Sequence, residues 1–256
     1  MRYKNYFLII ILLLSIASCN FFHSGKNDRV LNVIMLKSTL GCIYKDTTTA
    51  GFQYEIIKEF ADSFDYKLNI ILAENTESAI KQFTGGKGDI LACALPVTTA
   101  MKQKITFSTP LYTAKLVLIQ KKRSKKDNAL LAKNIFDLEE KNIYVPENSP
   151  YIKQLEYVME ESGTKFNIIK SSQNMEKLAE QVSSEKIAYL AVNSLTAAYL
   201  SNKNPDLDYS ISLGLNQFMA WGISKKEPQM GEQLNIFIEN FVKTEKYREI
   251  YVKYFS

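Results

Sequence analysis

The chain contains few residues that could do covalent or metal chemistry. His23 is its only histidine, and Cys19, Cys42 and Cys93 are its only cysteines in 256 residues. A serine-histidine-aspartate triad and most zinc sites need histidine within a folded domain. Because His23 lies in a short polar stretch near the N-terminus, these chemistries are excluded. We therefore expect no catalytic residues, no metal and no cofactor.

Cys42 and Cys93 remain as structural cysteines if Cys19 is modified. A disulfide between them is chemically possible in an oxidising compartment. Two cysteines about fifty residues apart do not establish a pairing by themselves. We expect two separate buried thiols.

The N-terminus has the pattern of a secretory signal. Two basic residues precede an apolar run over residues 7–14, and small residues precede Cys19. The run is shorter than the roughly 20 apolar residues that a membrane span needs. A charged start, a short apolar core and small residues before a cleavage point are typical of export. A plain signal anchor is the alternative.

The residues Ile-Ala-Ser-Cys at this point resemble a bacterial lipobox. The resemblance implies a lipoprotein signal peptide over residues 1–18 and an acylated Cys19. Residues 19–29 would then form a lipid-anchored tether to the membrane. We expect the protein to work in the cell envelope, facing the periplasm or the exterior, and the sequence leaves open which membrane holds it.

The charge of the chain is low and scattered. Its 32 basic and 27 acidic residues give a net charge of +5, or about +3 once the basic residues of the leader are removed. Nucleic-acid-binding proteins carry a stronger and more clustered positive charge, so no nucleic-acid partner is expected. The basic cluster at residues 121–126 is interpreted as a solvated loop, with contact to a membrane surface as the alternative.

Apolar periodicity predicts an α/β protein. Runs of apolar residues bounded by turn signals predict strands, and apolar positions at three- and four-residue spacing predict helices. The expected strands are residues 30–35, 67–72, 89–94, 116–120, 143–145, 166–169, 188–192, 209–213 and 219–224, and the expected helices are 51–65, 76–84, 150–162, 174–183, 194–203, 229–243 and 247–254. Two such halves in one chain predict two lobes with a cleft between them, where ligands usually bind.

Several segments together resemble the bacterial extracellular solute-binding proteins of family 3. In order along the chain they are GFQYEIIKEFA (51–61), GKGDILA (86–92), TFSTPLY (106–112), AYLAVNS (188–194), WGISKK (221–226) and YREIYVKYF (247–255). The resemblance implies an α/β, two-lobed periplasmic-binding-protein-like type II fold, in which each lobe is a mixed sheet flanked by helices. It places lobe 1 at residues 30–113 and 217–256 and lobe 2 at residues 114–216. Two hinge strands, near residues 112–115 and 216–218, would join the lobes.

Within that family, the chain resembles the binding domain of membrane-bound lytic transglycosylase F. The segment NKNPDL (202–207) and Trp221 within Ala-Trp-Gly carry this similarity. In those enzymes a lysozyme-like catalytic domain follows the binding domain. Because this sequence stops at Ser256, at the end of the last expected helix, we expect no catalytic domain and a protein that is not an enzyme.

The two charges that hold a zwitterion in amino-acid-binding members are missing from the matching positions. The resemblance places Met101 where an arginine binds the α-carboxylate, and Asn193 where an acidic residue binds the α-ammonium. Burying a zwitterion without paired charges is costly. We expect free amino acids to bind poorly, with Lys37 or Lys102 in place of the arginine as the alternative.

Other candidate ligand contacts come from helix starts and aromatic residues. Ser149 and Pro150 suit the first turn of a helix near residue 150, where free N–H groups favour an acceptor-rich ligand, although Ser149 is equally plausible as a cap alone. Aromatic residues offer stacking surface, but most of them belong to the core in such a chain. The expected ligand-binding residues are Lys37, Thr39, Tyr44, Asn75, Ala94, Pro96, Thr98, Met101, Asn148, Ser149, Asn193 and Trp221.

The leading hypothesis is a lipid-anchored solute-binding protein that captures a small, non-zwitterionic ligand by hinge closure. Sugar, peptide or muropeptide-like ligands fit better than a free amino acid. An ABC permease or a sensor is the expected protein partner, and the protein is expected to be a monomer. One alternative is an enzyme on this fold, a lytic transglycosylase or an arogenate-dehydratase-like hydrolyase. The other is a transglycosylase-related regulatory lipoprotein that binds peptidoglycan fragments or another envelope protein.

Overall fold

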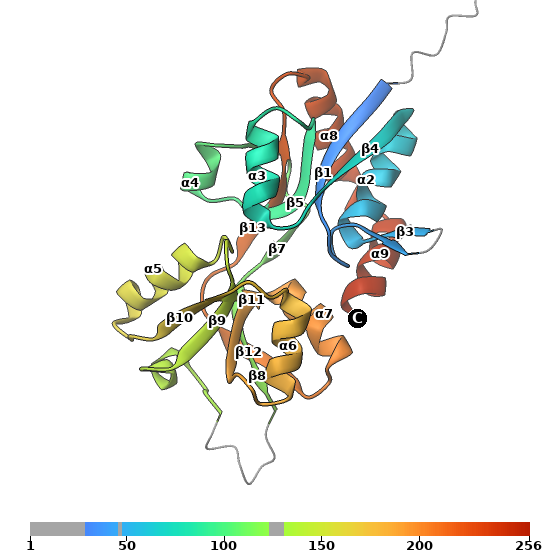
Figure 1. Ribbon diagram of the computed structural model, residues 1–256. Coiled ribbons are helices and arrows are strands. Elements are labelled where there is room, and N and C mark those ends of the chain that lie inside the picture. The colour runs from blue at the N-terminus through green and yellow to red at the C-terminus, as the bar shows by residue number, and fades with distance from the viewer. Residues whose placement is uncertain (1–28, 46–47, 123–130) are drawn as a thin grey trace, which may run out of the picture.

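The described strands form two large sheets and one small two-stranded hairpin. The computed structural model describes residues 29–45, 48–122 and 131–256. In these ranges the first sheet contains β1 (Arg29–Leu36), β4 (Tyr66–Ala73), β5 (Ile90–Pro96), β6 (Thr106–Phe107), β7 (Tyr112–Ala114) and β13 (Gln217–Ile223), in the order β4-β1-β5-β13-β6 with β7 paired to β13 (Figure 1). The second contains β8 (Leu116–Lys121), β9 (Asn142–Pro146), β10 (Asn167–Ser171), β11 (Tyr189–Asn193) and β12 (Leu207–Ser212), in the order β10-β9-β11-β8-β12.

Helices connect the parallel strands of each sheet. The described helices are α2 (Phe52–Ser63), α3 (Thr76–Thr84), α4 (Thr99–Lys102), η2 (Ile135–Leu138), α5 (Ile152–Ser162), α6 (Met175–Ser183), α7 (Ser194–Lys203), α8 (Pro228–Phe241) and α9 (Glu245–Phe255). β1 pairs in parallel with β4 and β5, and β9 pairs in parallel with β10 and β11. Such pairs need crossover connections, which α2, α3, α5 and α6 supply. The predicted two-lobed α/β fold is confirmed, and none of the described helices has the length and apolar character of a bilayer span.

The chain passes from one sheet to the other along two neighbouring segments. β7 is antiparallel to β13, with Tyr112 opposite Met219 and Ala114 opposite Gln217. β8 begins at Leu116, directly after β7, while β13 follows β12 after a short connection. The two passages therefore lie side by side where the sheets meet.

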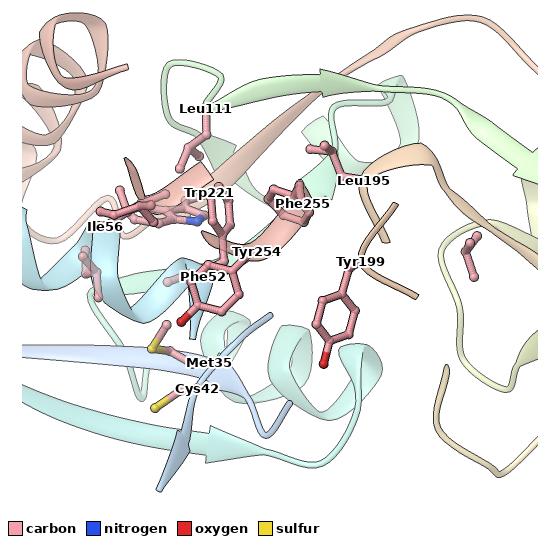
Figure 2. Close-up of a cluster of buried hydrophobic side chains, with 14 of the residues drawn as sticks. Met35, Cys42, Phe52, Ile56, Leu111, Leu195, Tyr199, Trp221, Tyr254 and Phe255 are labelled. Carbon is pink, nitrogen blue, oxygen red and sulfur yellow. The ribbon is translucent and has the colours of Figure 1, made fainter. Parts of the chain in front are cut away.

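Aromatic packing fixes the last helix against the start of α2. The ring of Phe52 lies 4.8 Å from that of Phe255 and 6.0 Å from that of Tyr254, measured between centroids. Figure 2 shows these rings close to Trp221, whose side chain is fully buried. The Tyr254 hydroxyl also accepts a hydrogen bond from the Gly51 backbone N–H at 2.9 Å. The start of α2 and the end of the last helix, which are far apart in the sequence, thus pack in one core.

The structure differs from the sequence-based expectation at short elements and at one helix start. The small hairpin of β2 (Ile43–Lys45) and β3 (Thr48–Ala50) was not predicted, nor were α4, η2 and β6, whereas β7 corresponds to the first of the two predicted hinge strands. The helix expected to begin near residue 150 begins at Ile152, with Tyr151 as its N-cap and no capping side chain. Asn148 adopts a φ of 63° and the Ser149 N–H bonds the Pro146 carbonyl, so the chain turns before the helix starts. The Ser149 hydroxyl accepts from the Tyr151 N–H at 3.3 Å within this turn, but, contrary to the prediction, Ser149 is not the N-cap residue of the helix.

Gly51→Ala should destabilise the protein far more than Gly163→Ala. Both glycines have positive φ, 148° and 72°, which L-residues rarely adopt. An added Cβ at Gly51 would lie 2.1 Å from the Gly41 carbonyl oxygen, whereas at Gly163 it meets no described atom within 4 Å. We expect the melting temperature to fall by roughly 2–4 °C for Gly163→Ala, from backbone strain alone, and by more than about twice that for Gly51→Ala. Thermal melts followed by circular dichroism would measure both, and equal losses would contradict the close approach at Gly51.

Candidate binding cavity

A cavity of about 500 Å³ is lined by residues of both sheets. The first sheet contributes residues at the carboxyl ends of β1, β4 and β5, and the second contributes residues at the carboxyl ends of β9, β10 and β11. Parallel strands end at one edge of a sheet, and the loops that follow them are the usual place for ligands in α/β proteins. The volume lies within the range of small-molecule sites.

Three asparagines at this edge cap the helices that follow the strands. Asn75, Asn174 and Asn193 each accept a hydrogen bond from a backbone N–H three residues further on, at 2.8–2.9 Å through Oδ1. Each asparagine also lines the cavity. Because Oδ1 serves the helix, the side-chain NH2 is the group left to face a partner.

The charged residues of the cavity wall are mostly acidic. They are Lys37, Glu74, Glu147 and Glu176. The Lys37 ammonium lies 3.4 Å from a carboxylate oxygen of Glu74, and both side chains are more than half exposed. Such a pair contributes little to stability, but it gives the lysine a carboxylate partner within the protein. The described wall includes no arginine.

A buried polar group lies at one side of the cavity. The Trp221 indole N–H donates to Oε1 of Gln53, and Gln53 is itself buried. Burial raises the pKa of the Tyr112 hydroxyl strongly, and the Gln53 amide, as a hydrogen-bonding neighbour, offsets a part of this. Burial likewise raises the pKa of Tyr151 to about 12, against a smaller lowering by the Asn193 amide. Both phenols are therefore protonated at neutral pH.

Half of the predicted ligand-binding residues line this cavity. They are Lys37, Asn75, Ala94, Asn148, Ser149 and Asn193. Thr39 is not in the wall, although its neighbours Ser38 and Leu40 are. Except for Ala94, which lies within β5, these residues end or follow strands, which is where ligand contacts are usual in α/β proteins.

The other predicted residues lie outside the cavity wall, for identifiable reasons. The Thr98 side chain caps α4 by accepting from the Met101 N–H at 3.2 Å, and Met101 packs against a buried cluster of the first sheet. Pro96 pairs with Met219 inside the sheet. Tyr44 is 61% exposed on the hairpin, and Trp221 is 0% exposed. Trp221 reaches the cavity only through Gln53.

Sequence reasoning missed several residues of the wall. These include Gln53, Tyr112, Tyr199, Glu147 and the segment 171–176. The segment could have been found, because it follows β10 and obeys the same rule as the loops that were predicted. The tyrosines and Gln53 come from helices and from β7, and no local signal separates them from ordinary core residues.

Both described cysteines are free and buried, as predicted. Burial raises the pKa of Cys42 to about 11 and that of Cys93 to about 12. A thiol with such a pKa stays protonated at neutral pH and is a poor nucleophile. Among the described residues no group of three or more His, Cys, Asp and Glu side chains could hold a metal ion. Cys19 lies outside the described residues.

The two sheets and the shared cavity define a two-lobed binding protein of the type II periplasmic class. The chain belongs to the bacterial extracellular solute-binding proteins, family 3, whose family model matches residues 31–256.

Curated relatives include membrane-bound lytic murein transglycosylase F of Aeromonas hydrophila subsp. hydrophila and of Aeromonas salmonicida. They are 29% identical over 232 residues and 27% identical over 226 residues, and each match covers 86% of this chain and 44% of the relative. The predicted similarity to this group is confirmed. The chain spans less than half the length of these relatives, so their whole activity does not follow from the match.

Solved structures with the same fold include amino-acid-binding proteins. The GluR0 ligand-binding core, in complex with L-glutamate, has a TM-score of 0.73 at 14% identity over 90% of this chain and 100% of that chain. AbpA from Streptococcus pneumoniae, bound to L-arginine, has a TM-score of 0.72 at 20% identity over 90% of this chain and 96% of that chain. At such identities the likeness establishes the fold alone.

The unfolding free energy should fall as pH rises above 10, and Tyr151→Phe should reduce the fall. Below pH 10 the Tyr151 hydroxyl keeps its proton in both states. Between pH 10 and the folded pKa of about 12, the unfolded state loses the proton first, so stability declines. The contribution of Tyr151 is about 2–3 kcal/mol over this interval.

Urea unfolding at several values between pH 8 and 12 would measure this dependence. Phe136→Leu, which changes an exposed aromatic side chain that has no titratable group, is the control and should keep the wild-type slope. Identical slopes for wild type and Tyr151→Phe would show that Tyr151 is not held protonated by the fold.

Proposed function

We propose that the protein is a lipid-anchored solute-binding protein that captures a small, non-zwitterionic ligand between its two sheets. The observation that carries the proposal is the composition of the cavity wall, which is rich in amides and hydroxyls and has no unpaired cation among its described residues. A carboxylate buried there would lack a partner charge, which is costly.

The positions of the candidate cations support the exclusion of free amino acids. Met101 stands outside the wall in a hydrophobic cluster, and Lys102 of the same short helix is exposed and also outside the wall. Lys37 is in the wall but lies beside Glu74. None of these side chains offers the fork of N–H groups that an arginine presents to an α-carboxylate.

The connection between the sheets supports capture by closure. Two paired strands, β7 and β13, carry the passages between the halves. Rotation about a few residues at such a connection can close two lobes over a ligand. The captured solute would be delivered to an ABC permease or detected by a sensor, with the protein acting as a monomer.

The names of the curated relatives favour a second candidate function. Because those relatives are membrane-bound lytic murein transglycosylases, fragments of peptidoglycan are candidate ligands. In this alternative the protein is non-catalytic or regulatory and responds to cell-wall turnover or to a protein partner. Muropeptides carry amides, hydroxyls and peptide groups, which suit the same wall.

A thermal-shift screen should identify a ligand among peptides, sugars or muropeptide fragments, but not among the common amino acids. A ligand at 100 times its dissociation constant adds about 2.7 kcal/mol to the unfolding free energy. For a chain of this size, the melting temperature should rise by roughly 5–10 °C. A shift of that size with a common amino acid would contradict the non-zwitterionic assignment.

A pair of variants would test whether the ligand binds in the cavity. Ala94 lines the cavity and Ala100 is exposed on α4 outside it. Ala94→Trp should fill the cavity and abolish the shift, whereas Ala100→Trp should retain it. If both variants respond to the solute like the wild type, the ligand binds elsewhere and the proposed site is wrong.

Cys19→Ala should release the protein from the membrane. The proposal assigns the anchor to an acyl group on Cys19, within residues that the structure does not describe. Cells grown with radiolabelled palmitate should label the wild type and not the variant, and the variant should appear in the soluble fraction. Labelling of Cys19→Ala would contradict a lipid at this residue.

A further inference from the structure

Three tyrosines line the cavity from three different elements. Tyr112 comes from β7 and Tyr151 precedes α5, while Tyr199 lies in α7. Tyr151 is 5% exposed and Tyr199 is 6% exposed. The Tyr199 hydroxyl is buried and has no hydrogen-bond partner among the described residues. Leaving a buried hydroxyl unpaired is costly, so a polar group from outside the chain is the natural partner.

The orientation of the Gln53 amide follows from its contact with Trp221. The indole N–H can only donate, and it donates to Oε1 of Gln53. The NH2 end of Gln53 is therefore the end that meets the Tyr112 hydroxyl, and it acts as the donor. The Tyr112 hydroxyl has one hydrogen of its own, which a contact of this kind does not use.

The same logic applies to Asn193 on the opposite side. Its Oδ1 accepts from the Thr196 backbone N–H at 2.9 Å, and a backbone N–H can only donate. The NH2 end of Asn193 is left to meet the Tyr151 hydroxyl as a donor. Tyr112 and Tyr151 are close enough to interact electrostatically. Two phenols that line one cavity, one from each half of the protein, thus each have an amide donor as a neighbour and a hydroxyl hydrogen that this contact does not use.

The charges of the wall decide which acceptor suits these donors. The wall carries three glutamates and one lysine that is beside one of them. A ligand carboxylate would add a negative charge to an acidic wall, whereas a carbonyl oxygen brings no charge. A carbonyl oxygen also has two lone pairs and can accept from both hydroxyls at once.

We propose that Tyr112 and Tyr151 together bind an uncharged carbonyl oxygen of a carboxamide or peptide group in the ligand. This proposal rests on the function proposed above. The ligand would be a compound that carries an amide group, and the two tyrosines would determine the specificity for it. The pair takes the place of the charged clamp for an α-carboxylate. The N–H groups of the same amide would find acceptors in the glutamates of the wall.

Calorimetric titration of matched acids and amides tests this assignment on the full chain. The probes are L-alanine against L-alaninamide, and L-alanyl-L-alanine against L-alanyl-L-alaninamide. We expect the amide of each pair to bind at least roughly 10-fold more tightly. Tyr112→Phe and Tyr151→Phe should each weaken amide binding by roughly 3- to 10-fold, because each removes one donor and keeps the ring.

Tyr247→Phe is the matched control. The Tyr247 hydroxyl is partly buried and donates to the Leu111 carbonyl at 3.1 Å, and Tyr247 does not line the cavity. This variant loses a hydroxyl of the same kind and should bind the amides like the wild type. A circular-dichroism melt of each variant would confirm that it is folded.

The outcomes separate this inference from the proposed function. Tighter binding of the acids, or amide affinities unchanged in both cavity variants, overturns the phenol assignment. If the amides fail but a sugar binds in an Ala94→Trp-sensitive manner, the phenol assignment falls and solute capture stands. If no solute of any class binds, both fall.

Discussion

The cavity depends on the way in which the two sheets are joined. In the described chain, the two sheets are joined through β7 and β13, which are hydrogen-bonded to each other. Residues at the carboxyl ends of six strands, three from each sheet, line one cavity. The fold thus brings together loops far apart in the sequence, and the proposed closure would take place about this paired connection.

The same side chains cap helices and line the cavity. Asn75, Asn174 and Asn193 each use their oxygen for a helix and leave their NH2 group at the cavity. Gln53 is oriented in the same way by an indole N–H. Hydrogen bonds that stabilise the fold therefore also determine whether the neighbouring groups act as donors. This composition of the wall is the basis of the proposal that the ligand is neutral and bears hydrogen-bond acceptors.

Sequence reasoning captured the parts of this arrangement that follow from local pattern. Apolar periodicity predicted most strands and helices. The family resemblance predicted Lys37 and Asn193 as ligand contacts, a helix start predicted Asn75, and all three line the cavity. Trp221 was expected in the cavity because of its residue type, and Tyr44 because of its type and its place after the first strand, but Trp221 is fully buried and Tyr44 is on the exposed hairpin. Periodicity cannot distinguish a core aromatic from a cavity aromatic, because that distinction depends on contacts such as that between Trp221 and Gln53. For the same reason, periodicity could not identify Tyr112 and Tyr199 as cavity residues.

Hydrogen–deuterium exchange, with and without the panel solute that raises the melting temperature most, would test the central claim most directly. A ligand held between the two sheets should slow exchange in residues 36–41 and 74–76 of the first sheet's loops, and together with them in residues 146–151 and 171–176 of the second. Protection confined to one of the two sets, or found outside both, would contradict capture in a shared cavity.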